Sequence, residues 1–268
     1  MKRRNSLPSP DLFPMPSPEH DVLIVASDES AIAKFESIDE ALKENAIRVD
    51  LLESSRSSAA RRLALRLKAT TSVERTFASP LYVREIRRRL VGYSLSQTAS
   101  QAVYHTTLVS AKGTIPLKEL SARVVQRHTQ RFRKQLVRIG CDKAGGFLSA
   151  WLHGDYNPIR KVFQLHWHII HTANHIPLLK ALSKQRAYRP SEYVAVPRRT
   201  VLIRDGWIQH SYAHQGFWYC RGRVPGMSNK PVKGRHRIPG RAHTRYLLTM
   251  DALRFSDTYI SYPPILKK

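Results

Sequence analysis

Two histidines one residue apart are the clearest chemical feature of the 268-residue sequence. His166 and His168 flank Trp167 within residues 162–171, a stretch whose β-branched and aromatic content predicts a strand. Alternate residues of a strand share one face, so both imidazoles project from the same side and Trp167 from the other. Neutral imidazole is a common metal ligand. The pair therefore supplies half of a metal site.

The predicted pairing of two strands brings a third histidine to this pair. Residues 147–155 also form a predicted strand, and the residues between the two strands have turn composition. A hairpin centred between Ile159 and Arg160 places His153 directly opposite His166. Three imidazoles then converge on one face of the sheet.

Two other interpretations of the histidines stay open. A register slip of one residue would turn His153 to the other face, and His105 or His171 would take its place. Alternatively, His166 and His168 are chance members of the twelve histidines of a basic chain and help to bind phosphate.

The remaining pattern predicts an α+β protein. The expected elements are a strand at 102–109 ending at the turn Lys112-Gly113, a helix at 116–139, the hairpin, a helix at 176–186, strands at 194–196 and 200–203, and an aromatic helix at 207–220. We expect a central antiparallel sheet of about five strands with flanking helices on one side and the metal site on the open face.

Three blocks, in this order, resemble the HUH endonucleases, the rolling-circle replication initiators of small plasmids and single-stranded phages. Residues 104–108 resemble the first motif of that family. Residues 146–157 and 165–170 resemble its strand pair ending in His-apolar-His, and residues 211–218 resemble its helix with the catalytic tyrosine. The resemblance covers about residues 100–225. It implies metal-dependent nicking and joining of single-stranded DNA through a phosphotyrosine intermediate.

The resemblance also suggests the nucleophile. Tyr212 lies in the matched block, after a predicted strand and at the start of a predicted helical stretch. Tyr193 is an alternative, and Tyr219 lies seven residues after Tyr212, which would put it on the same helix face in a two-tyrosine mechanism. Gln215 stands where the family commonly has a lysine one turn after the tyrosine.

The same resemblance implies a divalent cation held by His153, His166 and His168. The family usually has an acidic ligand where this sequence has His153. Mg²⁺ prefers oxygen ligands, whereas three imidazoles suit Mn²⁺ or another transition metal, so we expect Mn²⁺ to support activity best, with Mg²⁺ as the alternative in vivo.

Charge supports a polyanionic partner. The chain has 45 Lys and Arg against 20 Asp and Glu, a net charge of +25, although residues 1–53 hold eleven of the acids and only six of the bases. Such a field attracts phosphates and makes binding dependent on salt. Trp207 and Trp218 are expected either to stack on bases or to pack in the core. A loose basic run is expected either to contact the phosphate backbone of the nucleic acid or to form a solubilising tail. Its residues are Arg221, Arg223, Lys230, Lys233, Arg235 and Arg237.

Composition also predicts the organisation and location of the chain. We expect a disordered Pro/Ser-rich arm at 1–20, an acidic strand-helix appendage with a linker at 21–58, the catalytic domain at 59–225 and a basic C-terminal tail at 226–268. No apolar stretch approaches the roughly 18 residues that span a membrane, and Cys141 and Cys220 suggest no disulfide framework. The expected location is therefore the cytoplasm, without membrane contact.

The leading hypothesis is an enzyme that nicks a single-stranded replication origin, with host replication proteins as further candidate partners. A transposase or relaxase of the same superfamily is its near relation. The second hypothesis is a non-catalytic DNA-binding protein derived from such an enzyme, which Gln215 and the missing acidic ligand favour. The third is a zinc-stabilised RNA-binding protein, which the charge permits. Cleavage of a single-stranded origin separates the first two.

Overall fold

A computed structural model describes residues 38–68, 74–191, 194–204, 206–221 and 237–263, apart from the side chains of Trp207 and Ile208. The arm expected at 1–20 and the strand expected after Asp21 lie outside these residues. So do several candidate site residues: Tyr193, Arg223, Lys230, Lys233 and Arg235.

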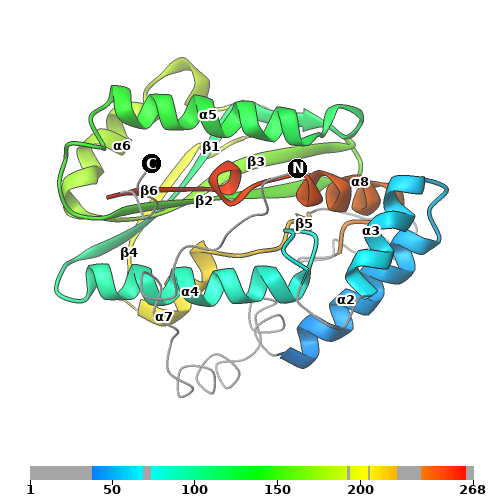
Figure 1. Cartoon of the computed structure of the whole chain (residues 1–268). Coiled ribbons are helices and arrows are strands. Elements are labelled where there is room, and N and C mark those ends of the chain that lie inside the picture. Colours follow the sequence, from blue (N-terminus) through cyan, green and yellow to red (C-terminus); the bar gives the residue numbers. More distant parts are fainter. Residues whose placement is uncertain (1–37, 69–73, 192–193, 205, 222–236, 264–268) are drawn as a thin grey trace, which may run out of the picture.

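A six-stranded sheet lies at the centre of an α+β fold, as the sequence predicts (Figure 1). Its strands are β1 (Val103–Pro116), β2 (Leu148–Asn157), β3 (Val162–Thr172), β4 (Arg198–Leu202), β5 (Tyr219–Cys220) and β6 (Tyr259–Tyr262). The order is β4-β1-β3-β2-β5, and β6 pairs with β2 near the start of that strand. All pairs are antiparallel except the two-residue pairing of β5 with β2.

Helices pack on both faces of the sheet, with α5 and α6 on one face and α4 and α7 on the other (Figure 1). The helices are α2 (Ile38–Glu53), α3 (Ser58–Lys68), α4 (Pro80–Thr98), α5 (Ala122–Arg138), α6 (Ile176–Ser183), α7 (Gly206–Ala213), α8 (Gly240–Asp251) and α9 (Phe255–Thr258). The described residues also form the short 3₁₀ helices η3 (Leu117–Glu119), η4 (Ala173–His175) and η5 (Arg186–Tyr188).

The expectation of helices on one side only is therefore wrong. The central strand β3 is buried along both faces from Leu165 to Thr172, which requires a cover on each side. On one face Trp167 stacks on Phe132 of α5, with ring centroids 4.5 Å apart. The histidine face lies toward α4 and α7.

The first strand is longer than predicted, because a bulge takes the place of the expected turn at Lys112-Gly113. The register of β1 against β3 shifts between Val109 and Thr114, and pairing then resumes as far as Pro116. A Cβ at Gly113 would collide with the carbonyl oxygen of Leu165, so the close approach of the two backbones requires glycine. The helix that follows begins at Ala122 instead of residue 116.

The described part of the expected C-terminal tail belongs to the folded body. Residues 240–262 form α8, α9 and β6, and β6 pairs with Leu148–Trp151 of β2. The described part of the expected N-terminal appendage is likewise packed, since α2 contacts α3, α4 and α8. Long-range packing that local composition does not reveal thus extends the domain beyond 59–225 at both ends.

No helix within the described ranges is long and apolar enough to cross a membrane.

Candidate metal centre

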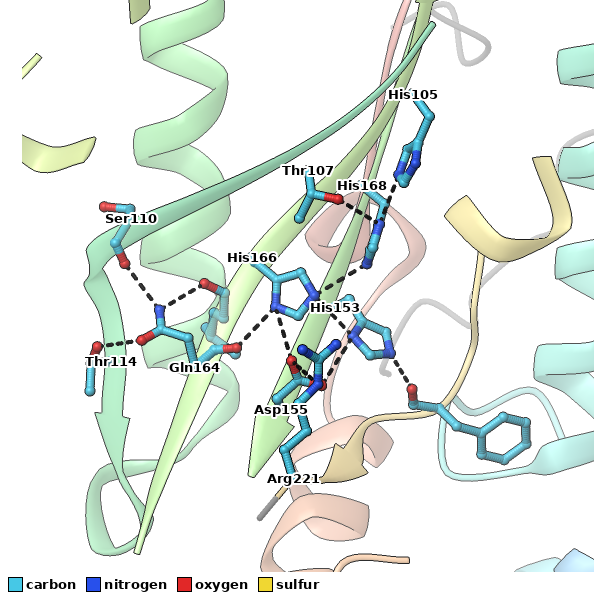
Figure 2. A network of polar contacts seen from close by, with 12 residues as sticks. His105, Thr107, Ser110, Thr114, His153, Asp155, Gln164, His166, His168 and Arg221 are labelled. Atoms are coloured by element: carbon cyan, nitrogen blue, oxygen red, sulfur yellow. Dashed lines mark hydrogen bonds and ion pairs between the residues drawn. The ribbon is translucent and has the colours of Figure 1, made fainter. Parts of the chain in front are cut away.

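The hairpin has the register predicted from its turn. His153 of β2 pairs with His166 of β3, and Trp151 pairs with His168, so there is no slip of one residue. The three histidines therefore project from one face of neighbouring strands (Figure 2). The strand alternation and the turn length together determine this convergence.

The inward ring nitrogens of the three histidines lie close enough to share one ion. His153 Nδ1 is 3.3 Å from His166 Nε2, which is 3.2 Å from His168 Nε2. One ligand atom from each residue lies within 4.8 Å of the others, and all three side chains are buried. In the described part of the chain this is the only group of three or more such side chains with this geometry.

The second nitrogen of each ring is held by a neighbouring group. His166 Nδ1 is 3.2 Å from the carbonyl oxygen of Gln164, and His153 Nε2 bonds the carbonyl oxygen of Phe217. A carbonyl oxygen only accepts, so in the neutral rings both of these nitrogens carry the proton and the inward nitrogens are lone-pair acceptors. Acceptors about 3 Å apart repel unless a cation lies between them. Metal-binding histidines show this same outer bonding, so the donor set fits a metal ion.

His105 contacts His168 from outside the group and does not take the place of His153 in it. Its Nε2 lies 2.9 Å from His168 Nδ1, on the outer side of the ring, where Thr107 Oγ1 is 3.5 Å away (Figure 2). Burial is the main cause that lowers the pKa of His105 to about 4, and the nearby basic groups His214, His171 and Arg199 add to it. His171 projects to the opposite face, where its Nε2 is 2.8 Å from Thr106 Oγ1.

An acidic side chain at the edge of the cluster was not predicted. Asp155 lies two residues after His153 on the same face of β2, with its oxygens 4.0 Å from His153 Nδ1 and from His166 Nδ1. Arg221 Nε binds the same carboxylate at 2.8 Å (Figure 2). The alternation of β2 could have revealed Asp155, whereas its partner Arg221 lies 66 residues away and is brought near by β5.

A cavity of about 430 Å³ opens beside the cluster. His166, His168, Asp155, Arg221 and Tyr212 are among its lining residues. The Tyr212 ring meets the His168 ring edge to face, with centroids 5.3 Å apart and planes at 89°. Of the candidate tyrosines that the structure describes, Tyr212 lines this cavity, whereas the Tyr219 ring lies 5.9 Å from the ring of His153 without lining it.

The expected helix 207–220 is shorter in the structure, which separates Tyr219 and Gln215 from the Tyr212 face. α7 ends at Ala213, and a Cβ at Gly216 would collide with Val83 of α4. Tyr219 lies in β5, so the expectation that Tyr212 and Tyr219 share a helix face is wrong. Gln215 is buried, and its carbonyl accepts a hydrogen bond of 2.7 Å from the indole of Trp151.

Of the expected nucleic-acid contacts, two make contacts within the fold, Trp218 and Arg237. Trp218 is buried in the core, with its ring against Phe163 and Tyr246. Arg237 binds Glu44 at 2.5 Å, on the side of α2. Arg221 is about half exposed at the cavity mouth. These placements leave Arg221 as the one residue of the predicted basic run described at the cavity.

Comparisons of the chain with protein-family models, with curated proteins and with solved structures found no match.

Proposed function

We propose that this protein nicks and rejoins single-stranded DNA in a metal-dependent reaction that initiates rolling-circle replication, with Tyr212 as the nucleophile. The observation that carries the proposal is the position of Tyr212 against His168, in the cavity that His166 also lines. A nucleophile beside a metal-binding group is the arrangement that phosphoryl transfer needs.

In this proposal, His153, His166 and His168 hold a divalent cation through their inward nitrogens. When bound, the cation would act as a Lewis acid toward the scissile phosphate. Because the donors are imidazoles, we favour Mn²⁺ over Mg²⁺. The half-exposed Arg221 is suited to orienting the phosphate at the cavity mouth, since its guanidinium can bind phosphate and carboxylate alike.

The proposed chemical step is a transesterification. The Tyr212 hydroxyl oxygen attacks phosphorus and loses its proton to water in the open cavity. The bond from phosphorus to the 3′-oxygen breaks, and that oxygen takes up a proton to give a 3′-hydroxyl. The reverse attack by a 3′-hydroxyl restores the DNA and the free tyrosine. The phosphodiester energy is conserved in the phosphotyrosyl bond, so rejoining needs no cofactor of its own.

The proposed partner is single-stranded DNA at a replication origin. The net charge of +25 favours a polyanion. A cavity of about 430 Å³ admits a nucleotide unit and does not enclose a whole strand. Host replication proteins, which would use the free 3′-hydroxyl, are proposed as later partners.

The test is covalent capture of labelled single-stranded DNA with Mn²⁺ on a denaturing gel. The unaltered chain should form an adduct, and Tyr212→Phe should form none, because phenylalanine keeps the ring and deletes the attacking oxygen. Tyr219→Phe is the matched control and should keep the adduct. Adduct formation by Tyr212→Phe would overturn the assignment of the nucleophile.

A non-catalytic DNA-binding role is the competing proposal, favoured by the burial of Gln215 where the related enzymes commonly have a lysine. In that case the unaltered chain would bind the labelled strand and form no adduct with Mn²⁺ or Mg²⁺. The same gel, run beside a binding measurement, therefore decides between the two.

A further inference from the structure

A second pocket, separate from the histidine cavity, lies at the turn between β2 and β3. Its volume is about 500 Å³, and Pro116 and Leu117 form part of its wall. The other lining residues are all basic: Lys118, Arg160, Lys161, Arg241 and Arg245. We infer that this basic pocket binds phosphates of a nucleic-acid strand outside the histidine cavity.

The charge of the pocket is the first reason. Five cationic side chains line one pocket, and no carboxylate from the described residues lines it; the exposed Glu119 is next to Lys118 but is not part of the wall. Like charges gathered around one hollow repel each other, and a bound anion relieves that repulsion.

The orientation of the arginines is the second reason. Arg245 donates to the carbonyl oxygens of Leu120 at 2.6 Å and of Lys118 at 3.2 Å. These partners are neutral, so they fix the guanidinium without cancelling its charge. Arg241 lies four residues earlier on α8, and residues at this spacing share one face of a helix. Two guanidinium groups are thereby presented to the same hollow.

The backbone at Lys161 is the third reason. Lys161 has a φ of 52°, the only positive φ of a non-glycine residue among those described. Glycine or asparagine takes this conformation more readily, so a lysine is conformationally unfavourable at this position of the turn. The amide of Leu117 donates to the Lys161 carbonyl at 2.8 Å and holds the turn against the pocket wall. A role for the lysine side chain explains why it is here.

The inference rests on the proposed function for the identity of the anion, which we take to be the backbone of the same strand that enters the histidine cavity. Lys161 is the residue before β3 and precedes His166 by five residues, a separation of roughly 16 Å at about 3.3 Å per residue. Single-strand binding sites span about 4–16 nucleotides, so one strand covers both places.

The test compares two charge-matched double variants of the full chain. Lys161→Asn with Arg241→Gln removes two cations from the pocket, and Lys134→Gln with Arg138→Gln removes two exposed cations from α5. Affinity for a labelled single-stranded oligonucleotide is measured between 50 and 200 mM salt, and circular dichroism verifies that each variant is folded. Each lost phosphate contact lowers the magnitude of the slope of log affinity against log salt by about 0.7. The slope of the pocket variant should therefore be smaller by roughly 1.4, and that of the α5 variant should change much less.

A pocket variant whose slope falls no further than that of the α5 variant would overturn the inference. Failure of the proposed function gives a different result. A chain that binds DNA with the expected pocket effect but forms no adduct would keep the phosphate site and remove the nicking activity. An unaltered chain that binds no single-stranded DNA at 50 mM salt would remove both.

Discussion

At the scale of single residues, the histidine cluster makes a prediction that separates metal binding from DNA binding. His166→Ala and His168→Ala each delete an inward nitrogen of the cluster. Loss of a group that merely supports a metal ligand weakens metal affinity by about 10–100-fold, so loss of a ligand should exceed that range. Mn²⁺ titration calorimetry should show this loss, the adduct should disappear, and DNA affinity should stay nearly unchanged because basic side chains supply most of it.

The control for these variants is His128→Phe, on the other side of the sheet. His128 is buried and its ring is parallel to that of Trp167, with centroids 6.1 Å apart, so phenylalanine keeps the ring stack. Mn²⁺ affinity should be unaffected in this variant. Metal-dependent nicking that survives in the His166→Ala, His168→Ala double variant would refute the metal site.

At the scale of secondary structure, α4 positions the short helix that carries Tyr212. The guanidinium of Arg87 is buried and donates to the Ser211 carbonyl at 2.8 and 3.2 Å and to the Ser211 hydroxyl at 2.6 Å. Arg87→Lys keeps the charge but loses this fork. Displacement of a reacting group by about 1 Å can cost roughly 100-fold, so adduct formation should slow by roughly ten- to hundredfold while Mn²⁺ affinity stays constant.

Arg89→Lys on the same helix is the matched control for Arg87→Lys. Arg89 pairs instead with Glu85, one turn away on α4. Its adduct rate should equal that of the unaltered chain. If Arg87→Lys reacts at the full rate, or loses metal affinity and rate together, Arg87 does not act by positioning Tyr212.

At the scale of the whole molecule, the buried ion pair of Glu44 and Arg48 on α2 also bonds to Ala78 and Arg237, which are far away in the sequence. Arg48 Nε donates to Glu44 at 3.0 Å and its Nη1 donates to the Ala78 carbonyl at 2.7 Å, while Arg237 binds the other oxygen of Glu44. Removing one partner of a buried pair leaves an uncompensated charge. Glu44→Gln should therefore lower the free energy of unfolding by about 3–5 kcal/mol in denaturant titrations at pH 7.

The pH dependence of this loss follows from the pKa of Glu44. Burial alone would raise that pKa, but Arg48 and Arg237 outweigh it and hold the pKa below its ordinary value of 4.5. A lowered folded pKa gives stability that is full above the unfolded value and is lost as the pH falls through the folded value. The difference in the free energy of unfolding between Glu44→Gln and the unaltered chain should thus be constant from pH 7 to pH 5. It should become smaller below about pH 4.5, where Glu44 takes up a proton.

The control for Glu44→Gln is Glu40→Gln, which breaks the exposed pair with Lys43 on the same helix. Exposed pairs contribute about 0–1 kcal/mol, so this variant should change stability little. An equal effect of the two substitutions would contradict a structural role for the buried pair. The same packing means that a truncation intended to spare the fold should stop before α2, which begins at Ile38.

The sequence by itself determined the local features of this protein. The two-residue alternation of β3 put His166 and His168 on one face, and the length of the turn set the pairing that added His153. Both are properties of a short continuous segment, and side-chain direction in a strand depends only on the neighbouring residues. The α+β class followed from the same local periodicities, with boundaries missed where the bulge at Gly113 continues β1.

The tertiary structure alone decided which distant residues join the cluster. Tyr212 reaches His168 because Arg87 holds α7 from 124 positions away, and Arg221 reaches Asp155 through the parallel pairing of β5. The basic pocket likewise gathers residues from β1, the hairpin turn and α8. Contacts of this kind come from the packing of a shared core, in which the position of each element depends on all the others. The spacing of neighbouring residues in the sequence therefore does not predict these contacts.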